Sequence, residues 1–232
     1  MWVKNTNQYH DIDIAAELAK QPAVKMKKDG KQILIYHTHT TEAFAGSSRT
    51  QDNSQNVVAV GEEIKKQLEA AGFGVVHDTT CHDYPSYNGS YDRSGETIQR
   101  NLEKYPDIQV TLDVHRDARG TQDGMRTKPT ALINGKKAAQ VMIISGCDDD
   151  GTLGFPNWEY NLRLGVRIQK SLSDLYPGLA RPLSFCPKKY NEHMTKGSLL
   201  VEFGTEVNTL EEVKYSGQLF GKALAETLEQ LT

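Results

Sequence analysis

A histidine and a glutamate three residues apart, His39 and Glu42, directly follow a short apolar segment. Two such side chains, placed where a strand turns into a loop, can reach one metal ion, and a distant histidine can supply a third ligand. Two histidines and one carboxylate, with a fourth position left open, form a common catalytic zinc set. His115, at the end of another apolar segment, is the histidine that we expect to complete this set, and Asp113 could orient its ring.

Two alternatives stand beside this interpretation. An isolated His-x-x-Glu pattern also fits a polar loop in which His39 bonds the backbone and Glu42 is solvated. His37 lies two residues before His39, so in an extended chain both side chains share one face, and His37 could replace His39 as ligand or orient it. We expect His39 to be the ligand because it lies nearer the carboxyl end of the strand and is spaced to Glu42.

A carboxylate stands inside the apolar segment 198–203, at Glu202. Burying it is costly unless it is paired or functional, and burial raises its pKa towards that of a useful general base. A base beside zinc-activated water suits the hydrolysis of an amide. The alternative is a structural ion pair with Arg116 or Arg126. In the catalytic interpretation, Arg116 lines the cleft and helps to stabilise the oxyanion of the tetrahedral intermediate.

Strands and helices alternate along the chain. Apolar runs rich in β-branched residues predict strands, and apolar residues at helical spacing predict helices. The expected strands are residues 32–36, 73–77, 108–114, 140–145 and 198–203, and the expected helices are 53–71, 94–105, 158–176 and a last one from 208. This alternation favours an α/β fold with a mostly parallel central sheet. Sites in such sheets lie beyond the carboxyl ends of the strands, which is where His39, His115 and Glu202 stand.

Local signals mark the ends of helices and a change of composition. Gly72 is expected to end the helix before it, and Thr209 with Glu212 has the spacing of a capping box at the start of the last helix. The first thirty residues are polar and lysine-rich. We therefore expect residues 1–30 to form an N-terminal extension that contains a short helix, and residues 31–232 to form the catalytic domain.

Composition argues against several classes of protein. The chain has 232 residues, with 27 Lys plus Arg against 30 Asp plus Glu, so its formal net charge is −3. This balance argues against a strongly basic nucleic-acid binder, and we expect no nucleic-acid partner. The three cysteines form no Cys-x-x-Cys pair, and neither a P-loop nor a Gly-x-Ser-x-Gly motif is present. The chain therefore lacks the signatures of a nucleotide site and of a serine hydrolase.

Six segments together form a more specific pattern. They are residues 35–44, 56–61, 82–88, 91–94, 113–117 and 201–204. This combination resembles the stage II sporulation protein P family, bacterial cell-wall hydrolases of the zinc N-acetylmuramoyl-L-alanine amidase class. The resemblance spans residues 31–232, and its sharpest parts are His-Thr-His-Thr-Thr-Glu and Asp-Val-His-Arg-Asp.

This resemblance implies an amidase fold, in which a central sheet is flanked by helices on both faces. It also implies one Zn²⁺ ion held by His39, Glu42 and His115, with Glu202 as the catalytic acid and base. The implied substrate is peptidoglycan. The family removes stem peptides from the glycan strands and also cuts peptide crosslinks.

The same resemblance implies a partner and a location. Family members act with stage II sporulation protein D, a glycan-cleaving protein, during engulfment of the forespore. They carry an N-terminal membrane anchor, which holds them outside the cytoplasm at the engulfing septum. No apolar run in this sequence approaches the ~20 residues needed to cross a bilayer. We therefore expect a soluble fragment that begins after the anchor.

Two other functions compete with this expectation. A zinc peptidase of the carboxypeptidase type uses a similar ligand set, and it needs a cation for the terminal carboxylate, for which Arg116, Arg119 and Arg126 are candidates. The second competitor is a wall-binding module that has lost catalysis. Such a module is expected to lack a ligand or the base, whereas this sequence keeps all four residues.

Overall fold

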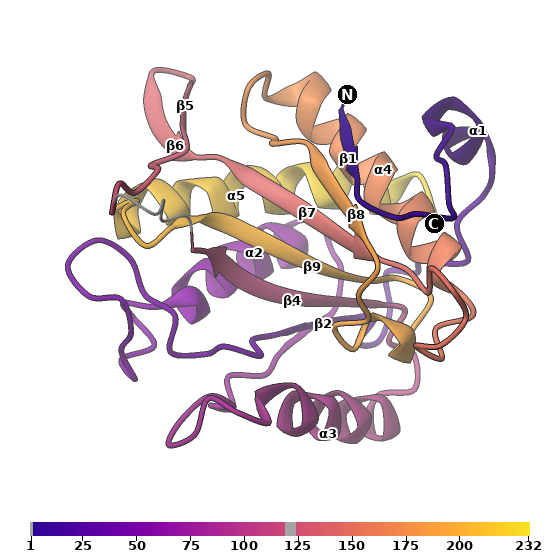
Figure 1. Cartoon of the computed structure of the whole chain (residues 1–232), viewed down its shortest axis with the longest axis horizontal. Coiled ribbons are helices and arrows are strands. Elements are labelled where there is room, and N and C mark those ends of the chain that lie inside the picture. The colour runs from indigo at the N-terminus through magenta and orange to yellow at the C-terminus, as the bar shows by residue number, and fades with distance from the viewer. Residues whose placement is uncertain (1, 119–123) are drawn as a thin grey trace.

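A seven-stranded sheet runs through the molecule, with helices on both of its faces (Figure 1). The computed structural model describes residues 2–118 and 124–232. The sheet strands are β1 (Val3–Asn5), β2 (Ile33–Tyr36), β3 (Val75–His77), β4 (Val110–Asp117), β7 (Val141–Gly146), β8 (Leu183–Cys186) and β9 (Ser198–Thr205). The helices are α1 (Ile14–Ala19), α2 (Val57–Ala70), α3 (Ser90–Lys104), α4 (Trp158–Leu175) and α5 (Leu210–Glu229). A separate hairpin joins β5 (Thr130–Ile133) to β6 (Lys136–Ala139), and a short 3₁₀ turn, η1, covers Glu192–Met194.

The strand order is β1-β8-β7-β9-β4-β2-β3, and five of the six neighbouring pairs are parallel. This arrangement confirms the expected α/β fold with a mostly parallel sheet. The exception is β7, which runs antiparallel to β9. Consequently, β2, β4 and β9 end at the same edge of the sheet, whereas β7, β8 and β1 run the other way. The sheet therefore has the expected edge, at which the strands that precede or carry the candidate site residues all end.

The alternation of side chains along each strand decides what covers each face. Ile33 and Ile35 of β2 join the large core beneath α2, α4 and α5, whereas Leu34 and Tyr36 join a smaller core beneath α3. All four side chains are buried, as expected for a strand covered on both faces. Figure 1 shows α3 on one side of the sheet and the other long helices on the opposite side. The α3 face is the one that carries the candidate site.

Two predicted helix ends are confirmed. Gly72 follows α2 with φ +87°, and its N–H donates to Glu69 O, while the N–H of Phe73 donates to Leu68 O. This is the Schellman arrangement, which requires a left-handed residue that glycine adopts without strain. Helix α5 begins with a reciprocal capping box between Thr209 and Glu212.

The first thirty residues contribute to the sheet and to its helical layer. Strand β1 pairs with β8 at one edge, with Val3 opposite Leu183. Helix α1 contacts α4, and the N–H of Met26 donates to Leu231 O over 2.9 Å. Among the described residues, no helix combines the length and the apolar character that crossing a bilayer requires.

Candidate metal centre and active site

His39, Glu42 and His115 come together at the carboxyl edge of the sheet. One ligand atom from each lies within 4.8 Å of the other two, and all three residues are buried. His39 Nδ1 lies 3.4 Å from Glu42 Oε1, and His115 Nδ1 lies 3.4 Å from Glu42 Oε2. His39 and Glu42 come from the loop after β2, and His115 comes from β4, as the spacing predicted.

These donors suit a zinc ion. Two ligand atoms that each stand about 2.0–2.1 Å from a tetrahedral zinc are about 3.3 Å apart. Both carboxylate–imidazole separations are 3.4 Å, close to that value. The set consists of two imidazole nitrogens and one carboxylate, which is the donor chemistry that zinc accepts with one position left for water or substrate.

A second carboxylate orients the ring of His115. Asp113 stands two residues earlier on β4, so both side chains point to the α3 face. His115 Nε2 lies 2.8 Å from Asp113 Oδ1, which leaves Nδ1 facing Glu42. Asp113 is itself held by Thr38, whose N–H and hydroxyl donate to it over 2.8 and 2.6 Å. The contact is a close electrostatic one, and a carboxylate beside the far nitrogen favours the orientation in which Nδ1 faces the site.

The electrostatics of the group favour a cation at its centre. Burial raises the pKa of Glu42, but the neighbouring imidazoles of His115 and His39 lower it more, so the pKa lies well below its usual value. Burial lowers the pKa of His115, but the carboxylates of Asp113 and Glu42 outweigh this effect and raise it well above its usual value. The group would therefore stabilise a cation at its centre, whether a proton or a metal ion that replaces it.

Glu202 lies on the next strand, beside His39, Glu42 and His115, which are called the metal group from here on. The register of β4 and β9 places it opposite His115, and it too points to the α3 face. Its Oε2 is buried, and no described residue forms a hydrogen bond with this oxygen. Arg126 stands apart, with Nε 3.7 Å from Glu206. The structural ion pair considered for Glu202 is therefore absent from the part of the chain that the structure describes.

Burial raises the pKa of Glu202 to about 8, although His115 opposes the shift. Between the usual value for an unfolded glutamate, about 4.3, and this higher value, the folded protein holds a proton that the unfolded chain has lost. The contribution of Glu202 to the free energy of unfolding therefore falls as pH rises through this range.

Glu202→Gln should consequently stabilise the metal-free protein at pH 9 relative to the wild type, and much less at pH 4. The neutral amide removes the cost of a buried charge, which exists only above the unfolded pKa. Urea denaturation of both metal-free proteins at the two pH values measures this difference. An equal difference at pH 4 and pH 9 would contradict the raised pKa.

His37, the alternative ligand, lies on the opposite face of β2. It continues the Ile33–Ile35 side, and its Nδ1 lies 2.9 Å from Val114 O. Its Nε2 lies 2.9 Å from Nε2 of His77. Burial lowers the pKa of His37 to about 3, so the ring is neutral. The structure therefore places His39 in the metal group and gives His37 a role in joining the strands that carry both ligands.

Arg116 points away from the metal group. The side chain alternates with that of His115, and its Nε donates to Ala43 O over 2.8 Å while Nη2 donates to Ser48 O over 2.9 Å. Its backbone N–H donates to Glu42 Oε2 over 3.1 Å. Arg116 was expected to stabilise an oxyanion. The structure instead has its guanidinium hold the loop that follows Glu42. Arg119, the other arginine considered, lies outside the described residues.

Arg116→Lys should weaken zinc binding by about ten- to hundredfold, the usual cost of losing a group that supports a ligand. Lysine keeps the charge but cannot bond two carbonyls with a planar fork. Competition against a coloured chelator measures the zinc affinity. Arg163→Lys, in an ion pair with Glu17 far from the site, is the matched control and should bind zinc like the wild type. Equal affinities for both variants would exclude the positioning role.

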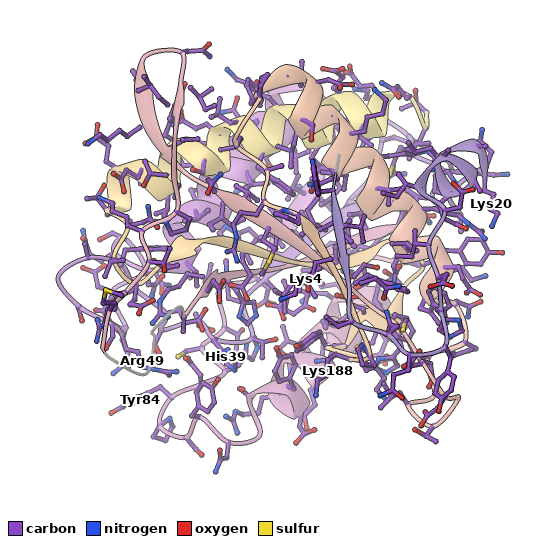
Figure 2. The ribbon with its side chains drawn as sticks, turned by 45° about the horizontal axis from the view of Figure 1, so that its top comes forward. Lys4, Lys20, His39, Arg49, Tyr84 and Lys188 are labelled. Carbon is purple, nitrogen blue, oxygen red and sulfur yellow. The ribbon has the colours of Figure 1, made fainter. Side chains whose placement is uncertain are left out.

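Two tyrosines flank His39 on the α3 side. The ring of Tyr87 stacks on His39 at 4.5 Å between centroids, and Tyr91 meets it edge-on at 5.5 Å. Figure 2 shows His39, Arg49 and Tyr84 on the same side of the molecule. The sequence carried no signal for Arg49.

Comparison with solved structures shows the class of fold. The fold is that of N-acetylmuramoyl-L-alanine amidases, which solved structures of that class share. The amidase AmiC2 of Nostoc punctiforme matches with a TM-score of 0.52 and 11% identity, covering 88% of this chain and 97% of its own. The CwlD amidase of Clostridioides difficile, solved with the GerS lipoprotein, matches with a TM-score of 0.51 and 10% identity, covering 87% and 98%.

Sequence comparison identifies the family. The profile of stage II sporulation protein P matches residues 3–225, so the chain belongs to this family. Stage II sporulation protein P of Bacillus subtilis (strain 168) is 29% identical over 84% of this chain. The match covers 50% of that relative, so the chain spans about half the length of the curated protein.

Proposed function

We propose that the chain is a zinc-dependent peptidoglycan hydrolase that cleaves the amide between N-acetylmuramic acid and L-alanine. The observation that carries the proposal is the buried group of His39, Glu42 and His115 beside Glu202 on the neighbouring strand, whose buried Oε2 has no hydrogen-bond partner among the described residues. The stage II sporulation protein P family and the amidase fold support a cell-wall hydrolase role in sporulation.

The residues of the site divide the work of hydrolysis. His39, Glu42 and His115 would hold the ion, and Asp113 would keep Nδ1 of His115 turned towards it. A bound zinc ion would supply Lewis-acid chemistry: it would polarise the carbonyl group and lower the pKa of a water molecule. Glu202 takes one proton from the attacking water and returns it to the leaving nitrogen. The C–O bond forms, the C–N bond breaks, and the carboxylate ends as it began.

The same proposal extends to the partner and the location. A glycan-cleaving protein, stage II sporulation protein D, would act on the same wall during engulfment, and the full-length protein would be anchored in the membrane at the septum. Cleavage of peptide crosslinks would be a second activity of the same centre, because both reactions hydrolyse an amide. These statements rest on the family to which the chain belongs.

Mass spectrometry of purified peptidoglycan after incubation with the zinc-loaded protein tests the function. Free stem peptides that begin with L-alanine, lost after chelation and restored by zinc, would establish the amidase. Cut crosslinks without free stem peptides would replace it by an endopeptidase, and trimmed carboxyl termini would favour a carboxypeptidase. Absence of products even after addition of the glycan-cleaving partner would point to a wall-binding module.

A further inference from the structure

A cavity of about 570 Å³ opens beside the metal group, within the range of small-ligand sites. Its walls come from the loop after β2 and from the loop before α3. Thr41, next to the ligand Glu42, and Tyr87, stacked on the ligand His39, both line it. The cavity therefore adjoins the candidate active site, because two of its lining residues touch or neighbour metal ligands in the chain.

Arg49 is the cation of this cavity. Its Nη1 donates to Asp83 Oδ2 over 3.0 Å and to the hydroxyl of Thr41 over 3.3 Å. Among the described residues, Nε and Nη2 have no hydrogen-bond acceptor, and the side chain is 42% exposed. One end of the guanidinium is thus fixed, while the other end keeps donors free for a ligand.

Asp83 is a fixed anchor for Arg49. Its carboxylate is fully buried and also accepts from the N–H and the hydroxyl of Thr41, over 3.0 and 2.7 Å. Together with the thiol of Cys81 at 3.8 Å, these donors satisfy this buried charge and immobilise it. An arginine that is held by a buried carboxylate is preorganised, so little side-chain entropy is lost when its outer edge binds an anion.

An aromatic layer links Arg49 to the metal group. The guanidinium lies over the ring of Tyr87 at 4.6 Å, and Tyr87 stacks on His39 at 4.5 Å. Tyr84 and Tyr87 remain about half exposed at the mouth of the cavity. The guanidinium therefore lies at most about 9 Å from the ring of a metal ligand, the sum of the two stacking distances. This is a span of two to three residues of an extended peptide at about 3.3–3.6 Å per residue.

We propose that Arg49 binds a free carboxylate of the stem peptide, on the leaving-group side of the scissile amide. This inference rests on the proposed function. The second residue of the stem is a glutamate joined through its side chain, so that its α-carboxylate is free when it is not amidated. That carboxylate belongs to the second residue from the scissile amide, which falls within this span, and a guanidinium with a free edge matches the planar carboxylate.

The test compares two substrates that differ only at this group. A muramoyl tetrapeptide with the free α-carboxylate and the same compound with an amide there are hydrolysed by the zinc-loaded wild type, Arg49→Gln and Arg49→Lys. We expect the wild type to prefer the acid by about tenfold or more in kcat/KM, because charge-assisted hydrogen bonds contribute that much. Arg49→Gln should lose this preference through KM for the acid alone, and Arg49→Lys should keep part of it.

A control variant distinguishes a role of Arg49 in substrate binding from a role in supporting the fold. Arg100→Gln, on the outer side of α3 and bonded to Thr97, should behave like the wild type. Zinc content and thermal unfolding of each variant show whether the fold persists. If Arg49→Gln lowers kcat/KM equally for the acid and the amide, Arg49 supports the loop instead of the substrate. Equal rates for both substrates in the wild type would also overturn the inference.

Calorimetry with the free tetrapeptides, as acid and as amide, keeps the inference independent of turnover. If the wild type hydrolyses neither substrate, the proposed function fails, and the binding measurement still decides the role of Arg49. Tighter binding of the acid, lost in Arg49→Gln, would support the carboxylate site even then. Equal binding of acid and amide would reject it.

Discussion

Glu202→Gln is expected to lower kcat by about 10²- to 10⁴-fold, the usual contribution of a positioned general acid or base. The buried Oε2 of Glu202 has no hydrogen-bond partner among the described residues, so replacing the carboxyl by an amide disturbs few contacts. The substitution removes the ability to accept a proton from water. It should leave the ligands His39, Glu42 and His115 in place.

Two measurements on the same sample check this result. Rates of stem-peptide release give kcat, and elemental analysis gives zinc per chain, which should equal that of the wild type. Glu206→Gln is the matched control, since Glu206 lies in the loop after β9 and pairs with Arg126. If Glu202→Gln retains most of its activity while Glu206→Gln is inactive, the base is Glu206 and the assignment is wrong.

The parts of the fold that the sequence predicted are those with strong local signals. The buried strands around 33–36, 110–117 and 198–205 and the four long helices were expected within a few residues. Strand β2 is apolar on both faces, and α5 carries a complete capping box, so each element can be predicted from its local sequence alone. His115 lies on one of these strands, and His39 and Glu42 follow another, so their proximity could be predicted.

The missed elements have weak local signals. Strands β1 and β8 are three and four residues long, and each forms through pairing with a neighbour distant in sequence. The β5–β6 hairpin is an exception, because it turns at Asn134 and Gly135, both with positive φ, and an Asn-Gly pair is a strong local signal for a hairpin that was overlooked. The antiparallel direction of β7 likewise depends on the path of the chain, which no local pattern encodes.

The choice between His37 and His39 illustrates a signal that was available in part. Alternation along β2 puts His37 on the side of Ile33 and Ile35, away from the face that carries His115. His39 would share that side in an extended chain, but β2 ends at Tyr36 and the turn over residues 38–41 carries His39 to the other face. Neither that turn nor the facing of the strands is marked by a local pattern. Arg49 had no signal at all, because its position depends on Asp83 and Tyr87 from another loop.

Loss of a metal ligand should have the largest effect on stability. A metal ion that binds only the folded state stabilises that state by about 4 kcal/mol when its free concentration is a thousand times its Kd. For a chain of this size, such a change raises Tm by roughly 10 °C. We expect zinc to produce this rise in the wild type and to produce none in His115→Ala or His39→Ala, because each variant leaves only two ligands.

His37→Gln is the variant that decides between the two histidines of the loop. It removes a buried ring bonded to Val114 and His77, so the metal-free protein should unfold at a lower temperature than the wild type. The rise in Tm on adding zinc should nevertheless persist, because His37 lies on the other face of the sheet. Thermal unfolding with and without zinc separates the two effects. A zinc-induced rise that disappears in His37→Gln and persists in His39→Ala would exchange their roles.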